Sequence, residues 1–143
     1  NKSENNEFTR IKVNADGFNS AGLDAYKSNS NRFSDLELFI RGNFGRGVNL
    51  RESSRNEFYS ATMNINGESS GGFSVYGLST ENRFYDSVIK VMEPASKEAI
   101  FGVDAIGDTE LINVAFLNNR FQFISAANGF KSAARLNWTA PQK

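Results

Sequence analysis

Asp35 and Asp86 are the residues of this sequence whose type and spacing could support catalysis. The chain contains no His and no Cys, which excludes a Ser-His-Asp triad, thiolate zinc sites and cysteine nucleophiles. Both aspartates occupy the same place of a sequence repeat, two repeats apart, so stacked repeats would separate them by roughly 9–10 Å. That separation lies near the upper limit for an inverting glycosidase. A structural alternative pairs Asp35 with Arg10 and leaves Asp86 solvated or capping a turn, and Glu57 with either aspartate is a further carboxylate pair.

Four tyrosines could bind sugars. Tyr59 and Tyr85 stand three places after a recurring Asn, and Tyr26 and Tyr76 stand twenty places after it. A tyrosine offers an apolar ring face to a pyranose and a hydroxyl group for hydrogen bonding. Because tyrosine is also a common strand residue, a purely structural role stays open.

No metal or cofactor is expected. Glu93 with Glu98, and Asp104 with Asp108, are the nearest approaches to a carboxylate cluster, and neither spacing is a recognised metal site. The stretch 42–47 is rich in glycine, but it joins two predicted strands instead of opening a helix, so it does not predict a phosphate site.

The overall charge predicts neither nucleic acid nor membrane as a partner. Sixteen Lys and Arg balance sixteen Asp and Glu, so no net field would hold the chain on a polyanion. No apolar run approaches the roughly 20 residues of a membrane helix. Since the sequence starts at Asn1, we expect a processed form or a piece of a longer chain.

A repeated phrase, Asn-x-Phe, organises the elements that must position these residues. It occurs at 6–8, 31–33, 56–58, 82–84 and 119–121, and a period near 25 residues is typical of stacked coils. Five, seven and nine places after the Asn, most residues are apolar, as in a half-buried strand. Paired glycines and a second short strand follow, so each rung is predicted as strand, glycine turn, strand and polar turn.

Charged residues favour parallel stacking of the rungs. One place after the Asn the sign alternates from rung to rung, and Lys12 would face Glu37. Opposite charges on neighbouring strands contribute roughly 0.2–1 kcal/mol per pair. The alternating residues are Glu7, Arg32, Glu57 and Arg83.

The segment from Asn31 to Leu38, Asn-x-Phe-x-Asp-Leu-x-Leu, followed by a glycine-rich turn and a second strand, carries a family resemblance. It resembles the single-stranded right-handed parallel β-helix of the pectate-lyase-like superfamily, and within it the tailspike and tail-appendage proteins of bacteriophages. The resemblance covers residues 6–106 and implies an all-β fold with about four rungs in residues 1–106. In that family a recurrent Asn stacks into a ladder, and the matching residues here are Asn6, Asn31, Asn56 and Asn82.

Residues 107–143 are predicted to form an antiparallel β cap or oligomerisation region. Asn118-Asn119 and Asn128-Gly129 separate apolar runs in the manner of tight hairpin turns. The aromatic residues of this region would fill the cap or join subunits.

The resemblance implies a segment of a phage tailspike-like adhesin, a homotrimer that binds or is positioned on bacterial surface polysaccharide. Such a protein is assembled in the host cytoplasm and acts in the virion tail, outside the cell. Two alternatives remain: a polysaccharide depolymerase, either hydrolase or lyase, that uses Asp35 and Asp86, and a purely structural stalk.

Overall fold

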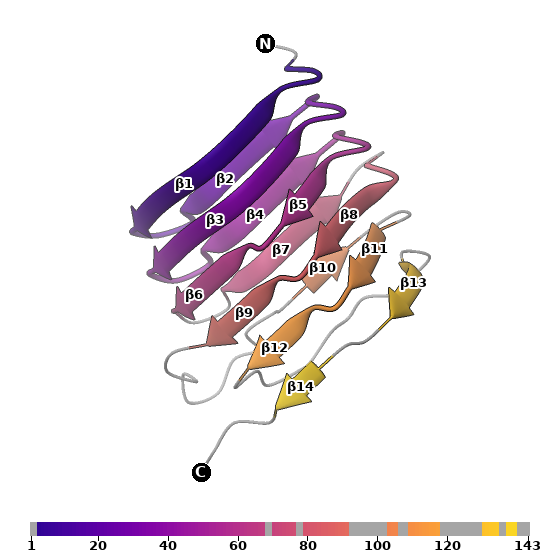
Figure 1. Ribbon diagram of the computed structural model, residues 1–143. Coiled ribbons are helices and arrows are strands. Elements are labelled where there is room, and N and C mark those ends of the chain that lie inside the picture. The colour runs from indigo at the N-terminus through magenta and orange to yellow at the C-terminus, as the bar shows by residue number, and fades with distance from the viewer. Residues whose placement is uncertain are drawn as a thin grey trace.

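The chain is a parallel β-solenoid of about three turns, each of about 25 residues. The computed structural model describes residues 3–67, 70–76, 79–91, 103–105, 109–117, 130–134 and 137–139. Figure 1 shows its strands stacked in two layers from the N-terminal to the C-terminal end. The all-β parallel architecture predicted from the sequence is therefore confirmed.

Each turn of the solenoid contributes strands to two sheets. The larger sheet contains β1 (Glu7–Asp16), β3 (Arg32–Arg41), β5 (Glu57–Tyr59), β6 (Thr62–Asn66), β8 (Asn82–Tyr85), β9 (Val88–Val91), β11 (Thr109–Ile112), β12 (Ala115–Leu117), β13 (Phe130–Ala134) and β14 (Asn137–Thr139). The smaller sheet contains β2 (Ala21–Tyr26), β4 (Arg46–Arg51), β7 (Gly71–Tyr76) and β10 (Val103–Ala105).

Neighbouring strands pair in parallel with the register that the repeat predicts. Phe8 is level with Phe33, Phe33 with Phe58, and Phe58 with Phe84. Their rings stack face to face with centroids 5.0, 4.8 and 4.6 Å apart. Phe58 and Phe84 are fully buried, whereas Phe8 at the N-terminal end of the stack is 37% exposed. This column of rings forms one wall of the core that separates the two sheets.

The recurrent asparagines form the predicted ladder. The side-chain amide of Asn31 donates to Oδ1 of Asn56 at 3.1 Å, and the amide of Asn56 donates to Oδ1 of Asn82 at 3.1 Å. Each Oδ1 also accepts the backbone N–H of the asparagine one turn earlier, at 3.0 Å in both cases. All three side chains are buried, so the ladder satisfies polar groups that water cannot reach.

The alternating charges pair across neighbouring strands. Arg83 lies 3.5 Å from Glu57 and 3.0 Å from Glu110, and Lys12 lies 2.9 Å from Glu37. The predicted pairing is confirmed for Arg83 with Glu57 and for Lys12 with Glu37. Glu110 is a further partner that the sequence pattern did not predict. Since the partners are partly exposed, each pair contributes little to stability, and its main effect is to disfavour a shifted register.

The bend within the larger sheet is made by residues in the left-handed region. They stand four places after the recurrent Asn, so the described coils between residues 6 and 91 bend at the same point. Asp and Asn tolerate this conformation better than most residues. The φ angles are 54° at Arg10, 55° at Asp35, 55° at Ser60 and 48° at Asp86.

Two physical causes, backbone conformation and lack of space, account for the predicted glycine columns. Gly17 and Gly42 have φ of 111° and 112°, which other residues rarely adopt. At Gly47 the limit is space, because an added Cβ would lie 2.6 Å from the carbonyl oxygen of Gly72 in the next turn. Glycine there lets the smaller sheet pack closely on the core.

Within 107–143 the described strands are parallel neighbours of the coils before them. β11 pairs in parallel with β8 and β13, and β12 pairs in parallel with β9 and β14. Thr109 and Leu111 are level with Asn82 and Phe84 of the turn before. Because this coil lacks the Asn-x-Phe phrase, the sequence repeat did not predict it. The turns at 118–119 and 128–129, on which the hairpin prediction depends, lie outside the described residues, so the cap stays a prediction.

Candidate functional site

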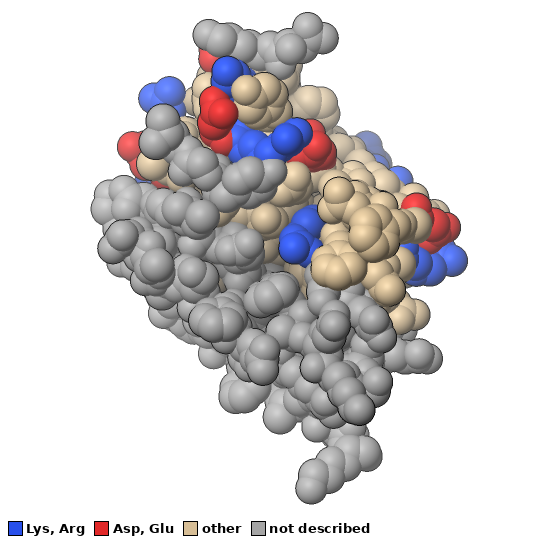
Figure 2. Space-filling view, turned by 180° about the vertical axis from the view of Figure 1, so that it is seen from behind, with Lys and Arg blue, Asp and Glu red and all other residues tan. Residues whose placement is uncertain are grey.

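A polar hollow on the outer face of the smaller sheet is the strongest candidate site. It has a volume of about 430 Å³ and lies across β2, β4 and β7. We call it the polar groove. Figure 2 shows this side of the molecule, with acidic and basic side chains interspersed over its N-terminal part. The residues that line the groove are Asn19, Ser20, Ala21, Asp24, Arg46, Asn49, Arg51 and Ser74.

The register of the parallel strands sets which side chains are neighbours in the groove. The register places Arg46 between Ala21 and Gly71, so the long side chain has short neighbours on both sides. Asn49 lies between Asp24 and Ser74 in the next outward column. Side chains from three neighbouring turns thus line the groove together.

A hydrogen-bond network orients the charged groups of the groove. Asn49 donates from Nδ2 to Oδ1 of Asp24 at 3.0 Å, and Arg51 donates from Nη2 to Oδ2 of the same carboxylate at 3.2 Å. Both oxygens of Asp24 are therefore engaged by protein donors. The Nε–H of Arg51 has no hydrogen-bond partner among the described residues.

Tyr26 stands beside the groove, in the strand place next to Arg51. Its side chain is 47% exposed. The guanidinium carbon of Arg51 lies 5.2 Å from the ring centroid, and Nζ of Lys27 lies 4.9 Å from it. The partly exposed ring of Tyr26 thus has two cationic groups close to it, and Arg51 links it to the groove.

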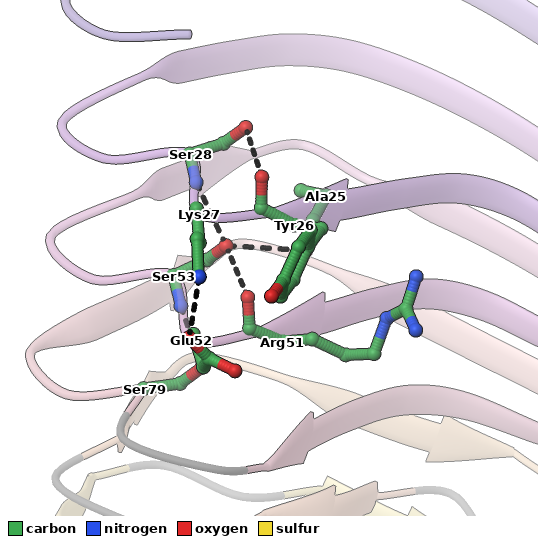
Figure 3. Close-up of polar contacts among 8 residues, drawn as sticks. All are labelled: Ala25, Tyr26, Lys27, Ser28, Arg51, Glu52, Ser53 and Ser79. Atoms are coloured by element: carbon green, nitrogen blue, oxygen red, sulfur yellow. Dashed lines mark hydrogen bonds and ion pairs between the residues drawn. The ribbon is translucent and has the colours of Figure 1, made fainter. Parts of the chain in front are cut away.

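A ladder of serines fixes the corner that carries Tyr26 and Arg51 (Figure 3). The backbone N–H of Ser28 donates to Oγ of Ser53 at 3.1 Å, and that of Ser53 donates to Oγ of Ser79 at 2.8 Å. Oγ of Ser53 also lies 2.9 Å from the carbonyl oxygen of Arg51. Because Ser53 and Ser79 are buried, the strand ends that present Tyr26 and Arg51 are held rigidly.

An ion pair spans the same corner. Nζ of Lys27 lies 3.5 Å from Glu52, and both residues have left-handed φ, 51° and 48°. The hydrogen bond with Tyr26, followed by the charge of Glu52, raises the pKa of Lys27 above its ordinary value. Lys27 is therefore a cation at the edge of the groove at neutral pH.

The other predicted sugar-binding pair lies on the larger sheet, away from Tyr26. The rings of Tyr59 and Tyr85 stack 4.7 Å apart, and the guanidinium of Arg32 lies 4.6 Å from the Tyr59 centroid. Arg32 comes from the preceding turn and Tyr85 from the following one, so both faces of Tyr59 are covered. Burial, then the hydrogen bond to Glu57, raises the pKa of Tyr59.

Among the predicted sugar-binding tyrosines whose side chains the structure describes, Tyr26 is the most exposed, and it lies beside the polar groove. The backbone of Tyr76 pairs with Arg51, but its side chain lies outside what the structure describes. The structure therefore does not join the four tyrosines into one site, and their role in binding stays a prediction.

Asp35 and Asp86 occupy the bend of the larger sheet. Asp35 lines a hollow of about 240 Å³ with Leu36, Glu37, Ser60 and Thr62, a set that does not include Asp86. Oδ1 of Asp86 accepts a hydrogen bond from Asn113 at 2.6 Å. No ion pair joins Asp35 to Arg10 in the described part of the chain. Their left-handed backbone gives both aspartates a conformational role, and their catalytic role stays a prediction.

Two searches of the described residues are relevant to other kinds of site. In that part of the chain, no three or more acidic residues cluster in a way that could hold a metal ion. The described segments also contain no helix of the length and apolarity needed to cross a bilayer.

Sequence reasoning missed the polar groove and the serine ladder. The serines share one place of the repeat and could have been found by reading that column. The groove could not be found in this way, because the residues that line it differ in type between equivalent places of neighbouring turns.

Comparison with known proteins assigns the chain to no family. No family model matches the sequence, and no curated protein and no solved structure matches it either. The class that the strands and their register define is the parallel β-solenoid.

Proposed function

We propose that this chain is a glycan-binding segment of a tailspike-like phage adhesin, built as a right-handed parallel β-helix with a C-terminal cap. In this proposal it acts as a homotrimer in the virion tail, outside the cell, after assembly in the host cytoplasm. Its ligand is a polysaccharide of the bacterial surface.

The observation that carries the proposal is the polar groove beside the exposed ring of Tyr26. Sugar hydroxyl groups need closely spaced donors and acceptors, and the groove offers amide, carboxylate, guanidinium and hydroxyl groups within 430 Å³. An adjacent aromatic ring supplies the apolar contact that a pyranose face prefers. The parallel strands place these groups on consecutive turns, so a ligand that crosses the strands would meet several of them.

Binding to an array of bacterial capsule and O-antigen polysaccharides tests this proposal. We expect at least one ligand, and we expect Tyr26→Ala to weaken binding roughly 5- to 10-fold through the lost ring contact. Phe39→Ala is the matched control, because Phe39 is an aromatic residue of the opposite sheet with Lys12 5.1 Å from its ring centroid. If the array shows no binding at all, the adhesin proposal is wrong and the structural stalk is favoured.

The hollow beside Asp35 favours depolymerisation as a second candidate function. A carboxylate in a small hollow on the surface of a solenoid could serve as an acid or a base. The double variant Asp35→Asn, Asp86→Asn should then abolish cleavage of the bound polysaccharide. Unchanged depolymerisation by the double variant would remove these aspartates from the reaction.

A further inference from the structure

Asp24 contributes a carboxylate to the lining of the polar groove. Asn49 donates from Nδ2 to its Oδ1 at 3.0 Å, and Arg51 donates from Nη2 to its Oδ2 at 3.2 Å. An ionised carboxylate has about four acceptor sites, shared between its two oxygens. The described donors use one site on each oxygen, so each oxygen has a further site for a ligand.

The carboxylate of Asp24 is held in place and is still accessible. Its side chain is 46% exposed, and that of Arg51 is 40% exposed. The parallel register sets Asp24 on β2 level with Asn49 on β4. Because two donors on the neighbouring strand already order the side chain, a ligand that binds to it meets a smaller entropy cost.

The charges around Asp24 favour an uncharged ligand at this point of the groove. Asp24 and Arg51 form an ion pair with no net charge, and Lys27 with Glu52 at the neighbouring corner adds none. An anion beside Asp24 would meet a like charge, which is costly in an interface. A hydroxyl group, in contrast, can donate to the carboxylate and accept from the second N–H of the Asn49 amide.

A pair of sugar hydroxyl groups matches the two open acceptor sites. The oxygens of one carboxylate lie side by side, and so do hydroxyl groups on adjacent ring carbons. Each hydroxyl can donate to one oxygen of Asp24, and hydrogen bonds to an ionised acceptor are about twice as strong as those between neutral groups. Tyr26, level with Arg51 and 47% exposed, offers an apolar contact to the sugar ring.

We infer that Asp24 binds an uncharged sugar unit of the polysaccharide through two hydroxyl groups on adjacent carbons, a vicinal diol. This inference rests on the proposed glycan-binding function and names the chemical class that the groove recognises. Asn49 and Arg51 hold the carboxylate in the orientation that presents both of its oxygens.

Periodate provides the test, because it cleaves the carbon–carbon bond of a vicinal diol. The probes are neutral capsular and O-antigen polysaccharides, each in native form and after periodate oxidation followed by borohydride reduction. We expect the intact protein to bind native chains and to lose at least about ten-fold in affinity on the treated ones, since charge-assisted hydrogen bonds are lost. Added salt should leave binding of the native chains nearly unchanged, because the ligand carries no charge to be screened.

A variant of the carboxylate separates this contact from other effects of the oxidation. Asp24→Asn keeps the size of the side chain but removes its charge and one of its two acceptor oxygens. It should weaken binding to native chains about ten-fold and should bind native and treated chains alike. Asp16→Asn is the matched control, because Asp16 pairs with Arg41 on the larger sheet as Asp24 pairs with Arg51 on the smaller one. This control should bind like the parent protein.

The outcomes distinguish this inference from the function beneath it. Equal binding of native and treated chains by the intact protein overturns the inference and leaves glycan binding intact. An equal loss of binding in Asp24→Asn and Asp16→Asn also overturns it. Failure to bind any polysaccharide overturns both the inference and the adhesin proposal. The comparison on the intact protein holds even if a variant fails to fold, which circular dichroism would reveal.

Discussion

Buried asparagines hold neighbouring turns in register at the scale of single residues. Asn56 accepts two hydrogen bonds from Asn31 and donates to Ser28 and Asn82. Every polar atom of its side chain is therefore used. Removing that side chain leaves several buried groups unsatisfied in two adjacent turns.

We expect Asn56→Ala to lower the free energy of unfolding by about 3 kcal/mol or more, since each unsatisfied buried group costs about 1–3 kcal/mol. Chemical denaturation measures the change. Asn66→Ala is the control, because Asn66 is exposed at the end of β6 and should cost less than about 0.5 kcal/mol. Equal losses in the two variants would contradict the role of the ladder.

Single residues also show where sequence reasoning succeeds and where it stops. The Asn place of the repeat was readable because one residue type recurs there and contacts its own copies. Tyr59 and Tyr26 looked equivalent in the sequence, yet the ring faces of Tyr59 are covered by Arg32 and Tyr85, whereas Tyr26 is 47% exposed. Exposure depends on neighbours from other turns, which a single place in the repeat does not reveal.

At the scale of elements, the phenylalanine column links four consecutive strands of the larger sheet. Phe58 on β5 has a stacked ring on each side, whereas Phe8 on β1 has one neighbour in the column. The contribution of each ring should therefore depend on its position in the stack.

Phe58→Ala is expected to lower the free energy of unfolding by about 3–5 kcal/mol, since it removes a fully buried ring and leaves a cavity. Phe8→Ala should cost less than half as much, because its ring is 37% exposed. Urea unfolding of both variants makes the comparison. A larger loss at Phe8 would show that the end of the stack, and not its middle, limits stability.

The strands themselves were largely predictable, with one informative failure. Alternating apolar places predicted the coils through Val91, but the next coil places Thr109 and Leu111 where Asn and Phe were sought. Parallel pairing needs a compatible shape and inward apolar residues, and it does not require the same residue types. A pattern defined by identity therefore ends before the stack does.

At the scale of the whole molecule, the proposed homotrimer is the property that is simplest to measure. Phe18 is 77% exposed and Phe44 is 42% exposed, and their ring centroids lie 5.2 Å apart. The two rings therefore offer an apolar surface that association could bury. Light scattering should give three times 15.8 kDa. Phe18→Ser should shift the protein towards the monomer, whereas Phe39→Ser, on β3 of the larger sheet, should not. A mass of 15.8 kDa at all concentrations would contradict the trimer.

The sequence by itself determined the coil of about 25 residues, the inward columns of Phe and Asn and the pairing of charges between strands. It could do so because residues one turn apart touch in a parallel stack, so that contact and sequence period coincide. Only the tertiary structure decided where the surface is hollow, which tyrosine is open to a ligand and how Asp24 is engaged. These properties depend on differences between neighbouring turns in side-chain length and direction, and a repeat records only what the turns share.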